Sequence, residues 1–141
     1  MTAEQGSQVL VTGGTGFIGR RLVRALLDAG AKVTVVDLLE PTEPGVHAVV
    51  GDMRDESVAG RAVSPGTDTI FHLAAVTSVL RSIEDPVGTY QANVQATATL
   101  LELARTRGVG SFIMASTNAV VGDVGTSVIT ERAPLHPLTP Y

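Results

Sequence analysis

The chain has no cysteine and no tryptophan, and such absences limit its chemistry before any motif is considered. Without cysteine it can form no disulfide, no thiolate nucleophile and no cysteine-ligated metal site. No uncharged apolar run approaches the roughly 20 residues that a membrane-spanning helix needs. Lysine and arginine total 10 against 14 acidic residues, with no basic cluster, so we expect neither nucleic acid nor a membrane surface as the main partner.

A secretory signal is also missing from the first residues, MTAEQGSQ, which lack a basic start followed by a long apolar run. We therefore expect a cytoplasmic protein. The 141 residues are 44% hydrophobic and 17% charged, which is typical of one globular domain with a buried core. Glycines and prolines occur singly or in short groups, so we expect residues 1–141 to form a single domain.

Apolar, β-rich runs alternate with segments of helical periodicity along the chain. The expected strands cover residues 8–12, 32–37, 46–50, 68–75 and 111–116. Expected helices follow the first strand, cover residues 55–62, and run from Pro86 to about Arg107. Strands this apolar, joined by helical crossovers, form a parallel sheet covered on both faces. The pattern predicts a doubly wound α/β fold with strand order 3-2-1-4-5.

Two of the expected helices carry apolar side chains at a helical spacing. In the first helix, Ile18, Leu22 and Leu26 recur every four residues, and Gly30 is placed to end that helix. The long helix has its own apolar positions, which include Tyr90, Val94, Leu101 and Ala104. These stripes predict which helix faces are apolar.

Four glycines fall within residues 11–20, VTGGTGFIGR, between the first strand and the first helix. Gly13 would allow a tight turn, Gly16 would let the backbone approach a pyrophosphate, and Gly19 would let the helix pack closely on the sheet. The N–H groups at the helix start, from Phe17 and Ile18, would then stabilise the phosphate charge. The alternative is a glycine-rich turn that holds no ligand.

An acid ends the second strand, at the position where a dinucleotide site places its ribose-binding residue. Asp37 lies eighteen residues beyond Gly19 (37 − 19). Its carboxylate can accept hydrogen bonds from both adenosine ribose hydroxyls and would repel a 2′-phosphate, which favours NAD over NADP. Arg20 and Arg21 lie near enough in sequence to complicate that preference. The alternative is a solvated loop acid.

TGGTGFIG at residues 12–19 resembles the TGxxGxxG fingerprint of the extended short-chain dehydrogenase/reductases, the NAD-dependent epimerase/dehydratase group. Further matches follow in the family's order over essentially the whole chain, at residues 51–55 (GDMRD), 72–75 (HLAA), 81–86 (RSIEDP) and 90–97 (YQANVQAT). The resemblance implies a Rossmann fold that binds NAD. It also implies cofactor contacts from the Asp52 side chain, the Met53 backbone, Leu73, Ala74, Ala75 and Asn93.

The same resemblance implies where the chemistry takes place. MASTNAVVG at 114–122 is similar to the segment whose hydroxyl holds the reacting oxygen, which makes Thr117 the candidate and Ser116 the second choice. PLTPY at 137–141 is similar to the run into a YxxxK motif, which makes Tyr141 the general acid/base. Val121 departs from the tyrosine that the family often has there. The alternatives are a turn-capping role for Thr117 and an incidental aromatic at Tyr141.

The lysine of YxxxK would fall at position 145, four residues after Tyr141, where this chain has no residue. A phenol needs nearby cations to ionise at neutral pH. We therefore expect the chain to be the N-terminal part of a longer enzyme, C-terminally truncated and inactive by itself. His72 is expected to be a satisfied core histidine, and His47 and His136 share no metal-ligand spacing, so we expect no metal.

The function implied by the resemblance is an NAD-dependent epimerase or dehydratase acting on a nucleotide sugar. Tyr141 would remove a hydroxyl proton while hydride passes to NAD, and Thr117 would orient the oxyanion. One alternative is an NAD-dependent dehydrogenase of a hydroxy acid or a sterol-like alcohol. Another is a non-catalytic NAD-binding module. Pairing of two copies through long helices, as a homodimer, is a further expectation for the full-length protein.

Overall fold

The protein is built on a parallel sheet, seen in a computed structural model that describes residues 6–141. The strands are β1 (Gln8–Thr12), β2 (Lys32–Asp37), β3 (His47–Val50), β4 (Thr69–His72) and β5 (Ser111–Met114). All neighbouring pairs are parallel, in the order β3-β2-β1-β4-β5. This order confirms the predicted doubly wound fold.

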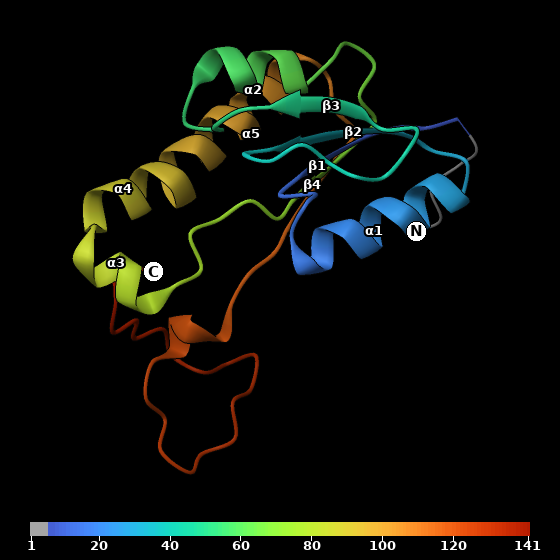
Figure 1. Cartoon of the computed structure of the whole chain (residues 1–141). Coiled ribbons are helices and arrows are strands. Elements are labelled where there is room, and N and C mark those ends of the chain that lie inside the picture. Colours follow the sequence, from blue (N-terminus) through green and yellow to red (C-terminus); the bar gives the residue numbers. More distant parts are fainter. Residues whose placement is uncertain (1–5) are drawn as a thin grey trace.

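The two faces of the sheet carry separate apolar layers. Because side chains alternate along a strand, Val9 and Val11 face one side while Leu10 faces the other. Helix α1 (Phe17–Asp28) packs on the first face; α2 (Glu56–Ala62) and α5 (Ala96–Thr106) pack on the second (Figure 1). Both layers contain side chains that are fully buried, which is where the hydrophobic stabilisation of the fold is concentrated.

Helix α1 ends as the sequence predicted, at a glycine. Gly30 has φ +82° and donates to the Leu27 carbonyl at 2.9 Å, while Ala31 donates to the Leu26 carbonyl at 3.0 Å. This pair of bonds is a Schellman motif, which satisfies carbonyls left free at the helix end. Ile18, however, is 65% exposed, so the apolar face begins at Leu22.

The long helix expected from Pro86 is not uniform. It consists of α4 (Pro86–Tyr90), a π-helical segment η1 (Gln91–Gln95) and α5, and it follows an additional short helix, α3 (Val79–Glu84), which the sequence did not predict. Asp85 separates α3 from α4, and its carboxylate accepts a hydrogen bond from Gly88 N–H at 2.8 Å. The capping aspartate and the proline at the first helical position explain why a new helix begins there.

Two strands end earlier than expected. β4 ends at His72 rather than Ala75, because the next two N–H groups, of Leu73 and Ala74, donate to the Thr12 hydroxyl. β5 ends at Met114 rather than Ser116. β3 begins at His47, one residue later than expected. A 3₁₀ turn, η2 (Asn118–Val121), was not predicted.

Two apolar stripes run along the long helix, and only one of them faces the sheet. Ala96, Leu100 and Ala104 are buried against α2 and the strands. The other set is exposed by 46–66%, and we call it the outer stripe: Val87, Tyr90, Val94 and Leu101. Of the four apolar positions noted from the sequence, only Ala104 is therefore buried.

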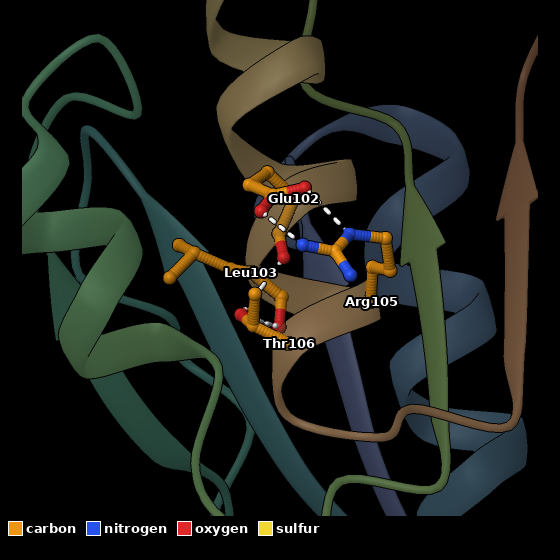
Figure 2. A network of polar contacts seen from close by, with 4 residues as sticks. All are labelled: Glu102, Leu103, Arg105 and Thr106. Atoms are coloured by element: carbon orange, nitrogen blue, oxygen red, sulfur yellow. Dashed lines mark hydrogen bonds and ion pairs between the residues drawn. The ribbon is translucent and has the colours of Figure 1, made fainter.

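Polar contacts organise the C-terminal end of α5. Arg105 donates to both carboxylate oxygens of Glu102, at 2.6 and 2.8 Å, and the Thr106 hydroxyl lies within hydrogen-bond distance of two carbonyls, those of Glu102 and Leu103 (Figure 2). This ion pair is exposed and contributes little to stability. One residue further on, Arg107 donates to the carbonyl of Gly60, at 2.7 Å, and to that of Val63, so it caps the end of α2.

The last fifth of the chain leaves the sheet after β5 and forms an extended loop, orange to red in Figure 1. Within it, His136 N–H donates to the Val120 carbonyl at 2.9 Å, which closes the loop between these two residues. Within the described part of the chain, no helix combines the length and the apolar character that crossing a membrane requires.

Candidate functional site

Several of the predicted cofactor-binding residues lie at the edge of the sheet where the parallel strands end. The strand order reverses between β1 and β4, which is where ligands bind in sheets of this kind. Asp37 ends β2, Asp52 and Met53 follow β3, and residues 73–75 follow β4. A separate hollow of about 370 Å³, lined by Gln8, Lys32 and His47, lies at the opposite edge and so belongs to a different part of the fold.

The glycine loop, residues 13–16, lies directly on the chain that leaves β4. Gly13 has φ +70°, and a Cβ there would be 2.8 Å from the Ala74 nitrogen. No other residue fits both the conformation and the space. A Cβ on Gly19 would overlap the Gly13 carbonyl oxygen, so Gly19 allows close packing of α1 on the loop itself rather than on the sheet.

The first turn of α1 presents unpaired N–H groups beside that loop. Gly16 is exposed, and a Cβ on it would meet only the Gly13 carbonyl oxygen, at 3.2 Å. No side chain caps the helix, and within residues 6–141 the N–H groups of Phe17 and Ile18 have no acceptor. A helix start of this kind favours an anion.

Asp37 connects the end of β2 to the glycine loop. Its Oδ2 accepts a hydrogen bond from Thr15 N–H at 2.9 Å, and its Oδ1 accepts one from Leu38 N–H at 2.7 Å. Each oxygen keeps a lone pair for a further donor. Arg20 and Arg21 are exposed, and Arg21 lies over the Phe17 ring, 5.6 Å from its centroid. Neither arginine forms an ion pair among the described residues.

Asp52 is held by its own neighbour. Arg54 donates to it from the backbone, at 2.9 Å, and through Nε and Nη2, at 2.9 and 2.6 Å. The Arg54 hydrogen bond lowers the pKa of the Asp52 carboxyl below its ordinary value. Met53, in contrast, is 8% exposed and packs into the core, so only its backbone is available at the edge.

A buried chain of hydrogen bonds joins β1, β4 and the long helix through His72. Thr12 Oγ1 lies 2.7 Å from His72 Nδ1, and Thr97 Oγ1 lies 2.8 Å from His72 Nε2. His72 is 3% exposed, and burial lowers the pKa of its imidazole below the ordinary value of 6.5. It is a satisfied core histidine, as the sequence predicted.

Asn93 lies in the π-helical segment and holds the β4 exit, which we define as residues 73–76. Its Oδ1 accepts from Val76 N–H at 2.8 Å, and its Nδ2 donates to the Val76 carbonyl at 3.0 Å. The Asn93 carbonyl accepts from the Thr97 hydroxyl at 2.7 Å. Wide π turns often occur at functional sites. One amide N–H of Asn93 remains free for a ligand.

The two predicted catalytic residues lie on the segment that follows β5. The Thr117 hydroxyl accepts a hydrogen bond from Ala119 N–H at 3.1 Å and so caps η2, the alternative role considered above; its own proton remains free to donate. Tyr141 is partly exposed, and no polar contact joins it to Thr117 within the described residues. Ser116 is exposed.

Thr12 and Thr97, which support this edge from behind, were not predicted from the sequence. Thr12 ends β1, and Thr97 lies one helical turn after Asn93. A hydroxyl four residues after the asparagine is the one sequence feature that could have indicated Thr97. It is a weak signal, because threonines are common on helices. Residues 6–141 contain no group of three or more acids and histidines that could hold a metal ion.

Comparisons with known proteins agree with this geometry. Residues 9–141 match the model of the NAD dependent epimerase/dehydratase family. A dTDP-glucose 4,6-dehydratase from Streptomyces griseus is 39% identical over 96% of the chain and 45% of its own length. A 3 beta-hydroxysteroid dehydrogenase/Delta 5-->4-isomerase from Mycobacterium tuberculosis is 40% identical over 86% of the chain and 34% of its length.

Solved structures give the same result. The UDP-glucose 4-epimerase of Thermus thermophilus, determined in complex with NAD, superposes with a TM-score of 0.88 at 37% identity, covering 95% of this chain and 46% of the epimerase. The chain thus spans less than half the length of the relatives it matches. It belongs to the NAD-dependent epimerase/dehydratase family.

Proposed function

We propose that this protein binds NAD along the carboxyl-terminal edge of its sheet. The observation that carries the proposal is the uncapped first turn of α1 beside the Asp37 carboxylate, with the glycine loop between them. The residues fit the cofactor, because the loop has side-chain-free space at Gly16 where a phosphate would lie. The relative from Thermus thermophilus was solved with NAD.

Several parts of the dinucleotide have a matching group at this edge. The N–H groups of Phe17 and Ile18 would bind the pyrophosphate. Asp37 would accept both ribose hydroxyls and repel a 2′-phosphate, which makes NAD the preferred cofactor. Asp52, held as an acceptor by Arg54, would bind the adenine, and the Asn93 amide would contact the cofactor from the β4 side.

We infer that the complete protein uses this site for hydride transfer on a nucleotide sugar. When bound, NAD supplies the hydride acceptor. Tyr141 would take the proton of the substrate hydroxyl, helped by cationic groups supplied beyond this chain. The Thr117 hydroxyl keeps its proton and can donate it to the substrate oxygen as negative charge develops there. The relatives' names support the substrate class, since they act on dTDP-glucose and UDP-glucose.

The test uses the full-length protein with NAD and either UDP-glucose or dTDP-glucose. A converted sugar without net NADH supports epimerisation or dehydration. The chain alone should bind NAD but turn nothing over. Failure of the chain to bind NAD, measured by calorimetry, would contradict the proposal at its first step.

A second reaction, oxidation of another alcohol, is favoured by one specific comparison. The hydroxysteroid dehydrogenase relative is as similar to this chain as the nucleotide-sugar enzymes are. In that case the full-length protein should release NADH in proportion to product and leave nucleotide sugars unchanged.

We also infer that two copies pair through the outer stripe. Val87, Val94 and Leu101 recur every seven residues along the long helix and are 66%, 47% and 46% exposed. Exposed large apolar side chains gathered on one helix are typical of a protein interface. Pairing would bury the stripe against its own copy in the partner.

A further inference from the structure

The protons around His72 can be assigned from the hydrogen-bond partners alone. A carbonyl oxygen can only accept, so the Thr97 hydroxyl donates to the Asn93 carbonyl, 2.7 Å away. Thr97 Oγ1 must then accept from His72 Nε2–H. A neutral imidazole has one N–H, so Nδ1 is the acceptor and receives the Thr12 hydroxyl proton.

With this assignment the Thr12 hydroxyl oxygen has no lone pair left to accept a further hydrogen bond. Its two lone pairs accept backbone N–H groups, from Leu73 at 3.1 Å and from Ala74 at 3.0 Å. A protonated His72 would direct a second N–H, at Nδ1, toward an oxygen that already accepts twice. One backbone bond must then break. Leu73 N–H has a second acceptor, the Thr12 carbonyl at 3.1 Å, whereas Ala74 N–H has no other acceptor within residues 6–141.

The bond from Leu73 yields first, because Leu73 N–H keeps the Thr12 carbonyl as an acceptor. Leu73 and Ala74 both lie beneath the glycine loop. Gly13 packs so closely on this segment that a Cβ would lie 2.8 Å from the Ala74 nitrogen and 2.9 Å from the Leu73 carbonyl carbon. A rearrangement of the Leu73–Ala74 peptide therefore displaces the loop. The protonation of a buried histidine is in this way coupled to the backbone of the cofactor site.

We propose that His72 is a positioning residue for the dinucleotide, and that its neutral form, protonated at Nε2, holds the β4 exit and the glycine loop in the binding geometry. At acidic pH, binding of NAD then releases one proton from His72. The inference rests on the proposed binding of NAD at this edge. It assigns a regulation by pH to that same site.

The surroundings of His72 favour the neutral form. Within residues 6–141 the hydrogen-bond and aromatic partners of the ring are the hydroxyls of Thr12 and Thr97 and the ring of Phe112, whose centroid is 5.9 Å away. None of them titrates and none is charged. Burial is the one cause that lowers the pKa of His72, so a proton is taken up only at acidic pH.

The experiment measures NAD binding to the 141-residue chain by calorimetry from pH 8 to pH 5.5, in pairs of buffers with different ionisation enthalpies. Below the pKa of His72 in the free chain, we expect affinity to fall by up to about tenfold per pH unit, with release of up to one proton on binding. His72→Gln, which cannot titrate, should give a flatter profile and no proton release. Affinity that is independent of pH in the wild-type chain would overturn the inference.

Two further variants separate positioning from simple loss of structure. Thr97→Val removes the acceptor of Nε2–H and should weaken NAD binding, and Thr97→Ser should restore both the affinity and its pH profile. His47→Gln changes an exposed histidine at the opposite edge and should behave as wild type. If His72→Gln does not fold, the number of protons that the wild-type chain releases on NAD binding still tests the inference.

The outcomes also distinguish this inference from the proposed function. Binding of NAD at pH 8 with an equal profile in the wild type and His72→Gln rejects the role of His72 but keeps the cofactor site. Absence of binding at every pH rejects both. A His47→Gln profile as flat as that of His72→Gln would likewise exclude His72 as the titrating group.

Discussion

Asp37 anchors the glycine loop, because its carboxylate Oδ2 accepts a hydrogen bond from the Thr15 backbone N–H at 2.9 Å. The acid that should select the cofactor therefore also orders the loop that should bind its phosphates. This double role means that removing the side chain and removing its charge have different consequences.

Asp37→Asn keeps an oxygen for Thr15 but loses the negative charge, so it should reduce discrimination against NADP by about 1–3 kcal/mol while NAD affinity falls modestly. Asp37→Ala should reduce discrimination as much and NAD affinity further, since the loop loses its anchor. Calorimetric titrations with both cofactors measure this. Unchanged NAD/NADP preference in either variant would reject Asp37 as the ribose-binding acid.

Gly16→Val should abolish tight NAD binding without unfolding the chain. Gly16 has φ −70°, which any residue adopts, and its added Cβ meets only one backbone oxygen. The larger side chain would occupy the space of the pyrophosphate, so affinity should fall at least about tenfold, or about 1.4 kcal/mol. Gly13→Val is the contrast, because its φ of +70° and its contact with Ala74 should destabilise the fold itself by about 1–3 kcal/mol. Thermal unfolding distinguishes the two; normal binding by Gly16→Val would contradict the site.

The stability of the chain should fall as the pH drops from 6.5. In the unfolded chain His72 binds a proton near its ordinary pKa of 6.5, and in the folded chain only at lower pH. Between these values the unfolded state binds more protons, so the free energy of unfolding rises with pH, by at most about 1.4 kcal/mol per pH unit. Urea unfolding from pH 7.5 to pH 5 measures this slope.

His72→Gln should lose that slope and His47→Gln should keep it. The carboxyl groups whose pKa is lowered by hydrogen bonds, such as Asp52, act below their own ordinary pKa of 3.8 and so in a separate, more acidic range. A wild-type profile that is flat between pH 7 and pH 5 would contradict the neutral assignment of His72.

Leu101→Glu should prevent self-association. A charge at the C-terminal end of the outer stripe would have to be desolvated in the interface, which costs several kcal/mol. Sedimentation equilibrium should show a dimer for the wild type and a monomer for the variant. Leu135→Glu, at a side chain 67% exposed outside the stripe, is the matched control. A wild-type chain that stays monomeric at high concentration would reject the interface.

The sequence predicted the sheet well because local signals agreed with the fold. Residues 8–12 and 32–37 form strands with the predicted bounds, since β-branched runs end there at a glycine loop and at Asp37. Gly30 ends α1 because its φ of +82° is a conformation that glycine adopts readily, which is also a local property. The strand order followed from the alternation of strands and helices, which leaves few topologies open.

The predictions were wrong where contacts between distant parts of the chain determine where a strand ends or which helix face is buried. β4 looked longer because residues 73–75 are apolar, yet the N–H groups of Leu73 and Ala74 turn to Thr12, about 60 residues earlier in the chain. Periodicity could not tell which stripe of the long helix faces the sheet, since Leu100 and Leu101 are adjacent and equally apolar but 0% and 46% exposed. The π-helical segment has no sequence signature of its own. Asp37, Asp52 and the residues that follow β4 lie at the carboxyl ends of the strands, while the roles of all the site residues stay predictions.

Arg107, at the C-terminal end of α5, binds the C-terminal end of α2. By donating to the carbonyls of Gly60 and Val63, it connects two helices whose contacting residues are more than forty positions apart in the chain. Neither helix end can fray alone without leaving a guanidinium or two carbonyls without their partners. The last turns of α2 and α5 should therefore open as one cooperative unit, and amide hydrogens in both should exchange with solvent at matched rates.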